Sequence, residues 1–138
     1  MKKLVYESLE EFEWDKTKVT GKKIKPNKIV YHVSDKKFRN NILSKGLSLN
    51  VGDSYRDWVK GKSAIPAIFA TNSDIDTVTG GISNFSGDIW EIHTDKINND
   101  WFKDKHFDSL EQYGVSNPHI VTFNSIPFNA IRLTHKSV

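Results

Sequence analysis

A strand, a short helix and a glycine follow one another between residues 28 and 47, and this succession constrains the fold more than any other part of the chain. Residues 28–33 predict the first core strand, which contains His32. Ser34 or Asp35 can cap the helix that follows, and Gly46 suits a left-handed helix end. The helical residues expected to face the core are Phe38, Ile42 and Leu43.

The rest of the chain predicts mostly strands. These are expected at residues 67–71, 88–94, 119–123 and 130–133. Ser73 or Asp74 begins a weak helix that Gly80 and Gly81 break. Strands and helices do not alternate in the second half, so a doubly wound fold is not expected. A chain of 138 residues suits one domain, and the pattern predicts an α+β fold with a split, mixed sheet and short helices.

The first 27 residues differ from the rest in composition. Apolar residues at helical spacing, from Leu4 to Phe12, predict an amphipathic helix that ends near Trp14. Six lysines and no carboxylate lie between residues 16 and 28. This segment is either a solvated linker or an arm that attracts a polyanion such as nucleic acid. The chain is therefore divided into residues 1–27, helix and linker, and a domain over residues 28–138.

Several classes of site are disfavoured by what the sequence lacks. It has no cysteine, which excludes disulfides, thiolate metal sites and a cysteine nucleophile. Neither a Walker A loop nor the dinucleotide fingerprint occurs. The histidines show no ligand spacing, so no metal site is predicted. No apolar run reaches the roughly 20 residues of a membrane span, so we expect a soluble, cytoplasmic protein without a membrane partner.

Three motifs stand in a characteristic order: Tyr31-His32-Val33-Ser34, then residues 41–47, then residues 67–73. Together they resemble the ADP-ribosyltransferase superfamily, in particular the branch of poly(ADP-ribose) polymerases and diphtheria-type toxins. Residues 88–92 are similar to the central strand of that family, and residues 119–133 to its closing strands. The resemblance covers about residues 28–134 and implies the fold of that family, with NAD as the substrate.

The resemblance implies roles for individual residues. His32 matches the histidine that hydrogen-bonds a ribose hydroxyl of NAD, and the backbone of Val33 takes the place of a glycine that holds the nicotinamide amide. Phe69 matches the aromatic residue that stacks on nicotinamide, and Ser73 lies near the polar residue that supports the amide. The other motif residues expected to bind NAD are Tyr31, Ser34 and Thr71. Without the resemblance, His32 also fits a structural hydrogen-bonding role and Phe69 a place in the core.

The chain departs from the family at its usual glutamate. That residue precedes the closing strand and stabilises the positive charge that the sugar gains when the nicotinamide–ribose bond breaks. Here the matching position is Pro118 or His119, depending on the alignment by one residue. His119 could bind ribose hydroxyls or act as an acid or base. Glu111 or Asp108 could instead reach the site from a loop, so His119 and Glu111 are the candidate catalytic residues.

Two classes of function follow from these residues. The first is an NAD-dependent ADP-ribosyltransferase, which transfers ADP-ribose to a protein or nucleic-acid acceptor or cleaves NAD. The second is a module that binds NAD, ADP-ribose or a related nucleotide without chemistry. A structural protein that docks through residues 1–27 is a third reading. The N-terminal sequence also resembles the start of bacteriophage proteins, which implies a role in phage–host conflict inside the host cell.

Overall fold

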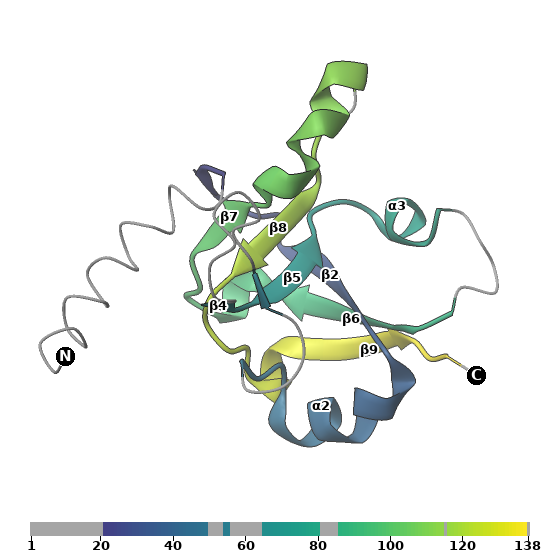
Figure 1. Ribbon diagram of the computed structural model, residues 1–138. Coiled ribbons are helices and arrows are strands. Elements are labelled where there is room, and N and C mark those ends of the chain that lie inside the picture. The colour runs from purple at the N-terminus through teal and green to yellow at the C-terminus, as the bar shows by residue number, and fades with distance from the viewer. Residues whose placement is uncertain (1–20, 50–53, 56–64, 81–85, 115, 138) are drawn as a thin grey trace, which may run out of the picture.

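Seven strands form one sheet in the order β1-β7-β8-β5-β2-β6-β9 (Figure 1). The computed structural model describes residues 21–49, 54–55, 65–80, 86–114 and 116–137. The strands of the sheet are β1 (Lys23–Ile24), β2 (Ile29–Ser34), β5 (Ile68–Thr71), β6 (Asp88–His93), β7 (Trp101–Lys103), β8 (His119–Thr122) and β9 (Ile131–His135). A separate two-stranded sheet consists of β3 (Ser54–Tyr55) and β4 (Ile65–Pro66).

The helices are few and short, which confirms the predicted α+β class. They are α2 (Arg39–Lys45), α3 (Ile75–Thr79) and the 3-10 helices η1 (Lys36–Phe38), η2 (Thr94–Lys96), η3 (Lys105–Tyr113) and η4 (Phe128–Ala130). The sheet differs from the predicted mixed one, because every pairing among the described strands is antiparallel. Residue patterns locate strands but do not set their relative direction, so parallel pairs had no basis in the sequence.

The predicted central strands are all present. β2, β5, β6, β8 and β9 fall within one or two residues of the expected ranges. The short helix α3 also begins and ends as expected, because the Asp74 side chain accepts a hydrogen bond from the Thr77 nitrogen and Gly80 closes the helix with a φ of 66°.

One face of the sheet carries the main hydrophobic core. Side chains alternate along a strand, so Val30 on β2 shares this face with Trp90 and Ile92 on β6. All three are fully buried, and α2 contributes Ile42 to the same cluster. The opposite face holds a second, smaller cluster, made of Ala67, Phe102, Val121 and Phe123, with Phe69 packed against it.

The segment from η1 to α2 begins at the predicted cap. The Asp35 side chain accepts a hydrogen bond from the Lys37 nitrogen at 3.0 Å. Ile42 is buried and Phe38 packs against the core, as predicted. Leu43 is 52% exposed, so the prediction that it faces inward is wrong. It follows Ile42 by one residue, which turns it about 100° around the helix and away from the core.

Gly46 ends α2 where two backbones approach closely. Its nitrogen donates to the Ile42 oxygen at 2.8 Å, but its φ of 78° and ψ of −162° lie outside the left-handed helical region that the sequence predicts. A Cβ here would meet backbone atoms, among them the Phe128 nitrogen at 2.6 Å. Only glycine therefore fits this position.

The sequence pattern does not predict β1 and β7. Lys23 and Ile24 pair with Phe102 and Trp101, although they lie in the predicted linker. The domain therefore includes residues from Gly21 onward, whose nitrogen donates to the Lys103 oxygen at 2.7 Å. A two-residue strand is too short to show an alternating pattern. The predicted helix ending near residue 14 lies outside the described residues.

Candidate functional site

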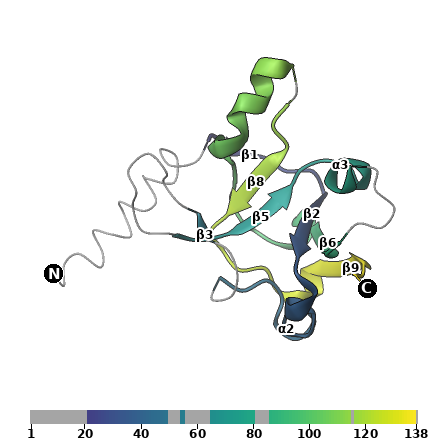
Figure 2. The same ribbon diagram turned by 45° about the vertical axis from the view of Figure 1, so that its right-hand side comes forward.

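Strand β2 pairs unequally with its two neighbours. It faces β6 at six register positions, from Ile29 to Ser34, but it faces β5 at one position, where Tyr31 lies opposite Thr71. Figure 2 shows β5 and β8 on one side of β2, and β6 and β9 on the other. The sheet is therefore joined least firmly between β2 and β5.

His32 spans this junction. Its Nδ1 lies 2.6 Å from the backbone oxygen of Phe69 on β5. A carbonyl oxygen can only accept, so Nδ1 carries the proton, and Nε2 of the neutral ring is an acceptor. The imidazole thus binds a strand carbonyl next to the point where backbone pairing between β2 and β5 stops.

The junction opens into a groove of about 210 Å³. The groove lies between the end of β2, the segment from η1 to the residues after α2, and the start of β5. Its polar lining residues are His32, Ser34, Asp35, Asn41 and Ser48. The other lining residues are Val33, Phe38, Ile42, Gly46, Leu47, Ala67 and Ile68. An apolar surface with a few converging polar groups is typical of a small-molecule site.

The hydroxyl group of Ser34 has a defined role in this groove. Its Oγ lies 3.0 Å from Nε1 of Trp90, which is fully buried. An indole N–H can only donate, so Oγ accepts from it. The O–H proton of Ser34 then remains to be donated to a ligand.

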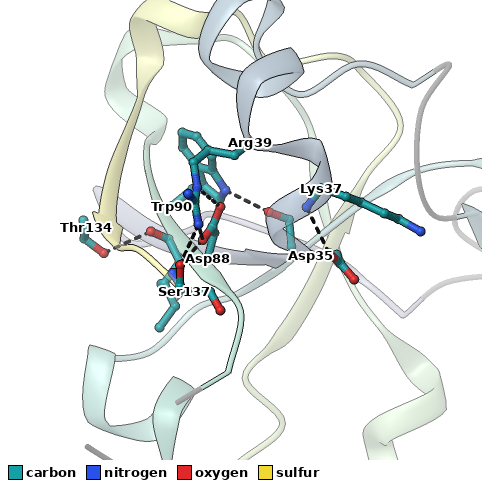
Figure 3. A network of polar contacts seen from close by, with 9 residues as sticks. Asp35, Lys37, Arg39, Asp88, Trp90, Thr134 and Ser137 are labelled. Atoms are coloured by element: carbon teal, nitrogen blue, oxygen red, sulfur yellow. Dashed lines mark hydrogen bonds and ion pairs between the residues drawn. The ribbon is translucent and has the colours of Figure 1, made fainter. Parts of the chain in front are cut away.

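A buried ion pair holds the wall of the groove in place (Figure 3). Arg39, at the start of α2, donates from Nε and Nη2 to the two carboxylate oxygens of Asp88, at 2.8 Å each. The Ser137 nitrogen donates to Asp88 at 2.8 Å, and its oxygen accepts from Arg39 at 2.8 Å. The Arg39 hydrogen bond lowers the pKa of Asp88 against the opposing effect of burial, so the carboxylate stays ionised. The pair therefore ties α2 to β6 and to the C-terminal segment.

Three of the seven predicted NAD-binding residues line the groove: His32, Val33 and Ser34. Phe69 takes part through its backbone oxygen, whereas its ring packs against the second cluster on the opposite face. Tyr31 and Thr71 lie opposite each other on that same face, because residue 31 alternates with residue 32. Ser73 follows β5 and is not among the residues that line the groove.

The structure does not bring the two candidate catalytic residues to the groove. His119 lies opposite Thr71, so it shares the face of Tyr31 and points away from the face of His32. Phe107 stacks on its imidazole with the ring centroids 3.9 Å apart. Burial lowers the pKa of His119, and the charge of Asp104 partly opposes this. The neutral imidazole is therefore favoured.

Glu111 lies on η3, more than half exposed, with Oε2 3.6 Å from Nζ of Lys103. Asp108 belongs to the same helix. The alternative glutamate position, Pro118, lies just before β8, and its oxygen accepts from the Asn72 nitrogen at 2.7 Å. Proline supplies no charge, so neither alignment provides the carboxylate.

The face opposite the groove carries a polar row that sequence reasoning missed. In register across three strands lie Tyr31, Glu91 and Arg132. Glu91 accepts from Arg132 at 3.2 and 3.1 Å, and Nε2 of His93 lies 3.2 Å from its Oε1. Burial, and next the charge of Glu91, raise the pKa of Tyr31. Glu91 is therefore a partly buried ion-pair residue, whereas its alternation with Trp90 suggests exposure.

Sequence reasoning also missed polar residues of the groove itself. Asp35 is predicted as a helix cap, and it does cap, but it also lines the groove. Asn41 and Ser48 lie on and after α2 and line it as well. The sequence signal that could have indicated these three residues is their position in or next to the motifs at residues 31–34 and 41–47.

Neither a protein-family model nor a curated protein matches this chain. Among the described residues, no group of three or more His, Asp or Glu side chains is arranged to hold a metal ion. Within the same part of the chain, no helix has the length and apolarity to cross a membrane.

Proposed function

We propose that the groove beside His32 binds a nucleotide of the NAD or ADP-ribose type through one of its ribose groups. The observation that carries this proposal is the position of His32, which spans the β2–β5 junction and lines an open groove. A core histidine with only a structural role would not need to border a cavity. The resemblance of the three motifs to ADP-ribosyltransferases supports the same ligand.

The ribose is recognised by complementary hydrogen bonds. Nε2 of the neutral His32 ring accepts from a ribose hydroxyl, while Nδ1 stays bound to the Phe69 oxygen. Ser34 donates its hydroxyl proton to a ribose or phosphate oxygen, while its Oγ accepts from Trp90. One acceptor and one donor, each held in place by a hydrogen bond within the protein, match a hydroxyl-bearing sugar better than a purely apolar ligand.

The geometry favours binding over turnover. Pro118, one of the two positions that match the family's glutamate, carries no charge, while Glu111 is paired with Lys103 and His119 faces away from His32. The best-supported function is therefore the module that binds NAD, ADP-ribose or a related nucleotide.

ADP-ribosyl transfer is the second candidate, and one observation favours it. Asp35 lines the groove with His32 and supplies a carboxylate there. In such a reaction the bond between the ribose and the nicotinamide nitrogen breaks, and nicotinamide leaves with the bonding electrons. The cationic sugar is stabilised by a carboxylate and then captured by water or by a protein or nucleic-acid nucleophile, which loses a proton.

Calorimetric titration with ADP-ribose tests the binding function. His32→Ala is expected to weaken binding about tenfold, because one hydrogen bond of roughly 1.4 kcal/mol is lost. His93→Ala is the matched control, since this imidazole lies on the opposite face with Glu91. Equal affinity for the wild type and His32→Ala would refute the assignment.

A nicotinamide-release assay with NAD separates the two candidates. Release that Asp35→Asn abolishes, without a loss of ADP-ribose affinity, would establish Asp35 as the carboxylate of a transferase or hydrolase. Binding without release is the result expected for the binding module.

A further inference from the structure

A second hollow adjoins the groove across the end of β2. It has a volume of about 440 Å³ and is lined by Val33, Ser34, Asp35, Lys36, Ser86, Gly87 and Ser137. The residues from Val33 to Asp35 line both hollows, which places the two hollows on either side of this segment.

The groove beside His32 is too small for a complete dinucleotide. Its volume of about 210 Å³ is below the range of roughly 300–1,000 Å³ that holds drug-sized ligands. A ligand whose ribose is bound at His32 must therefore continue elsewhere, and the hollow beyond Ser34 shares three lining residues with the groove.

The second hollow is polar, and its groups suit a phosphate. Lys36 supplies a cation, and the hydroxyl groups of Ser34, Ser86 and Ser137 supply donors. Ser34 accepts from Trp90, and this contact leaves its O–H proton available as a donor. The Asp88 carboxylate beside Ser137 is buried and paired with Arg39, so its charge is compensated before a ligand arrives. Asp35 is the opposing charge, and its Oδ1 is bound to the Lys37 nitrogen.

We propose that this second hollow binds a phosphate group of the nucleotide whose ribose lies at His32, with Lys36 and Ser34 as its main partners. The inference rests on the proposed function for the orientation of the ligand. The phosphate site itself stands on the residues around Lys36.

The test uses a pair of matched variants of neighbouring lysines. Lys36→Ala removes a lining cation, whereas Lys37→Ala removes the same charge from a residue whose Nζ lies 5.1 Å from the centre of the Phe38 ring. Calorimetry is performed with ADP-ribose, with inorganic pyrophosphate and with adenosine, which has the ribose but no phosphate.

Lys36→Ala is expected to weaken ADP-ribose and pyrophosphate about fivefold and to leave adenosine unchanged. Lys37→Ala is expected to change each affinity by less than about twofold, because Lys37 does not line the hollow and exposed charges are screened. Asp35→Asn is expected to strengthen pyrophosphate binding, since it removes a like charge.

Equal losses in Lys36→Ala and Lys37→Ala would overturn the proposal, as would a loss of adenosine binding in Lys36→Ala. So would wild-type protein that binds neither ADP-ribose nor pyrophosphate at millimolar concentration. If pyrophosphate binds and depends on Lys36 while adenosine does not bind at all, the phosphate site stands and the ribose site at His32 fails. The two proposals are thus tested separately.

Discussion

The two sides of β2 differ in how far the strand is paired with its neighbour. Toward β6 the strand is paired at six positions, and Val30, Trp90 and Ile92 on these two strands are fully buried. Toward β5 it is paired at one position, and a side chain, His32, makes the next connection. Continuous backbone pairing between β2 and β6 leaves no room for a ligand. Where the pairing between β2 and β5 stops, polar groups are exposed beside the groove. Stability is therefore expected to depend on the β6 side, and recognition of the ribose on the β5 side.

The largest expected effect is on stability from the β6 side. Ile92→Ala is expected to lower the free energy of unfolding by about 3–4 kcal/mol, because it leaves a cavity in the main core. Ligand affinity should not change in the folded fraction, since Ile92 does not line the groove. Urea unfolding together with calorimetry checks both statements, and a changed affinity would mean that the two sides are not separable.

The second effect concerns Gly46, which ends α2 and lines the groove. Gly46→Ala is expected to cost about 2–3 kcal/mol, because a Cβ would meet the backbone of the Ile126–Phe128 segment at a positive φ. Thermal unfolding measures this cost. Gly80→Ala is the control, since its φ of 66° is also positive but nothing lies within 4 Å of an added Cβ. Equal costs would show that the φ alone matters and that the close approach does not.

A smaller effect on stability is expected from the β5 side. His32→Ala should lower the free energy of unfolding by only about 1 kcal/mol, the typical net worth of one hydrogen bond. The same variant should lose about tenfold in ADP-ribose affinity. If His32→Ala destabilises the protein as much as Ile92→Ala, the imidazole is a structural element and the contrast between the two sides disappears.

The smallest effect is a pH dependence from the face opposite the groove. Burial lowers the pKa of His119 below its ordinary value of 6.5, so the unfolded chain binds a proton more readily than the folded one. The contribution of His119 is present above pH 6.5 and is lost as the pH falls toward its folded pKa. His119→Phe should make stability less sensitive to acid in this range, as measured by urea unfolding at several pH values. An unchanged profile would contradict this.

The sequence predicts the local elements of this molecule better than their assembly. Asp35 and Asp74 cap the helices that follow them, because a cap depends on neighbouring residues alone. The strand β1 could not be predicted, since Lys23 and Ile24 become a strand only by pairing with a partner far along the chain.

The candidate site was also predictable where it depends on neighbouring residues, and not where it depends on how the strands assemble. His32, Val33 and Ser34 share one strand, so a motif could place them together in the groove. The place of His119 depends on register across three strands, and a shift of one residue moves a side chain to the other face. Pro118 and His119 stayed alternatives because the match to the family's glutamate can shift by one residue.

A crystal structure with ADP-ribose bound tests the central claim most directly. The account predicts a ribose hydroxyl within hydrogen-bond distance of Nε2 of His32, with Nδ1 still on the Phe69 oxygen and β2 and β5 still paired only at Tyr31 and Thr71. ADP-ribose bound on the opposite face, beside Tyr31 and His119, would contradict it.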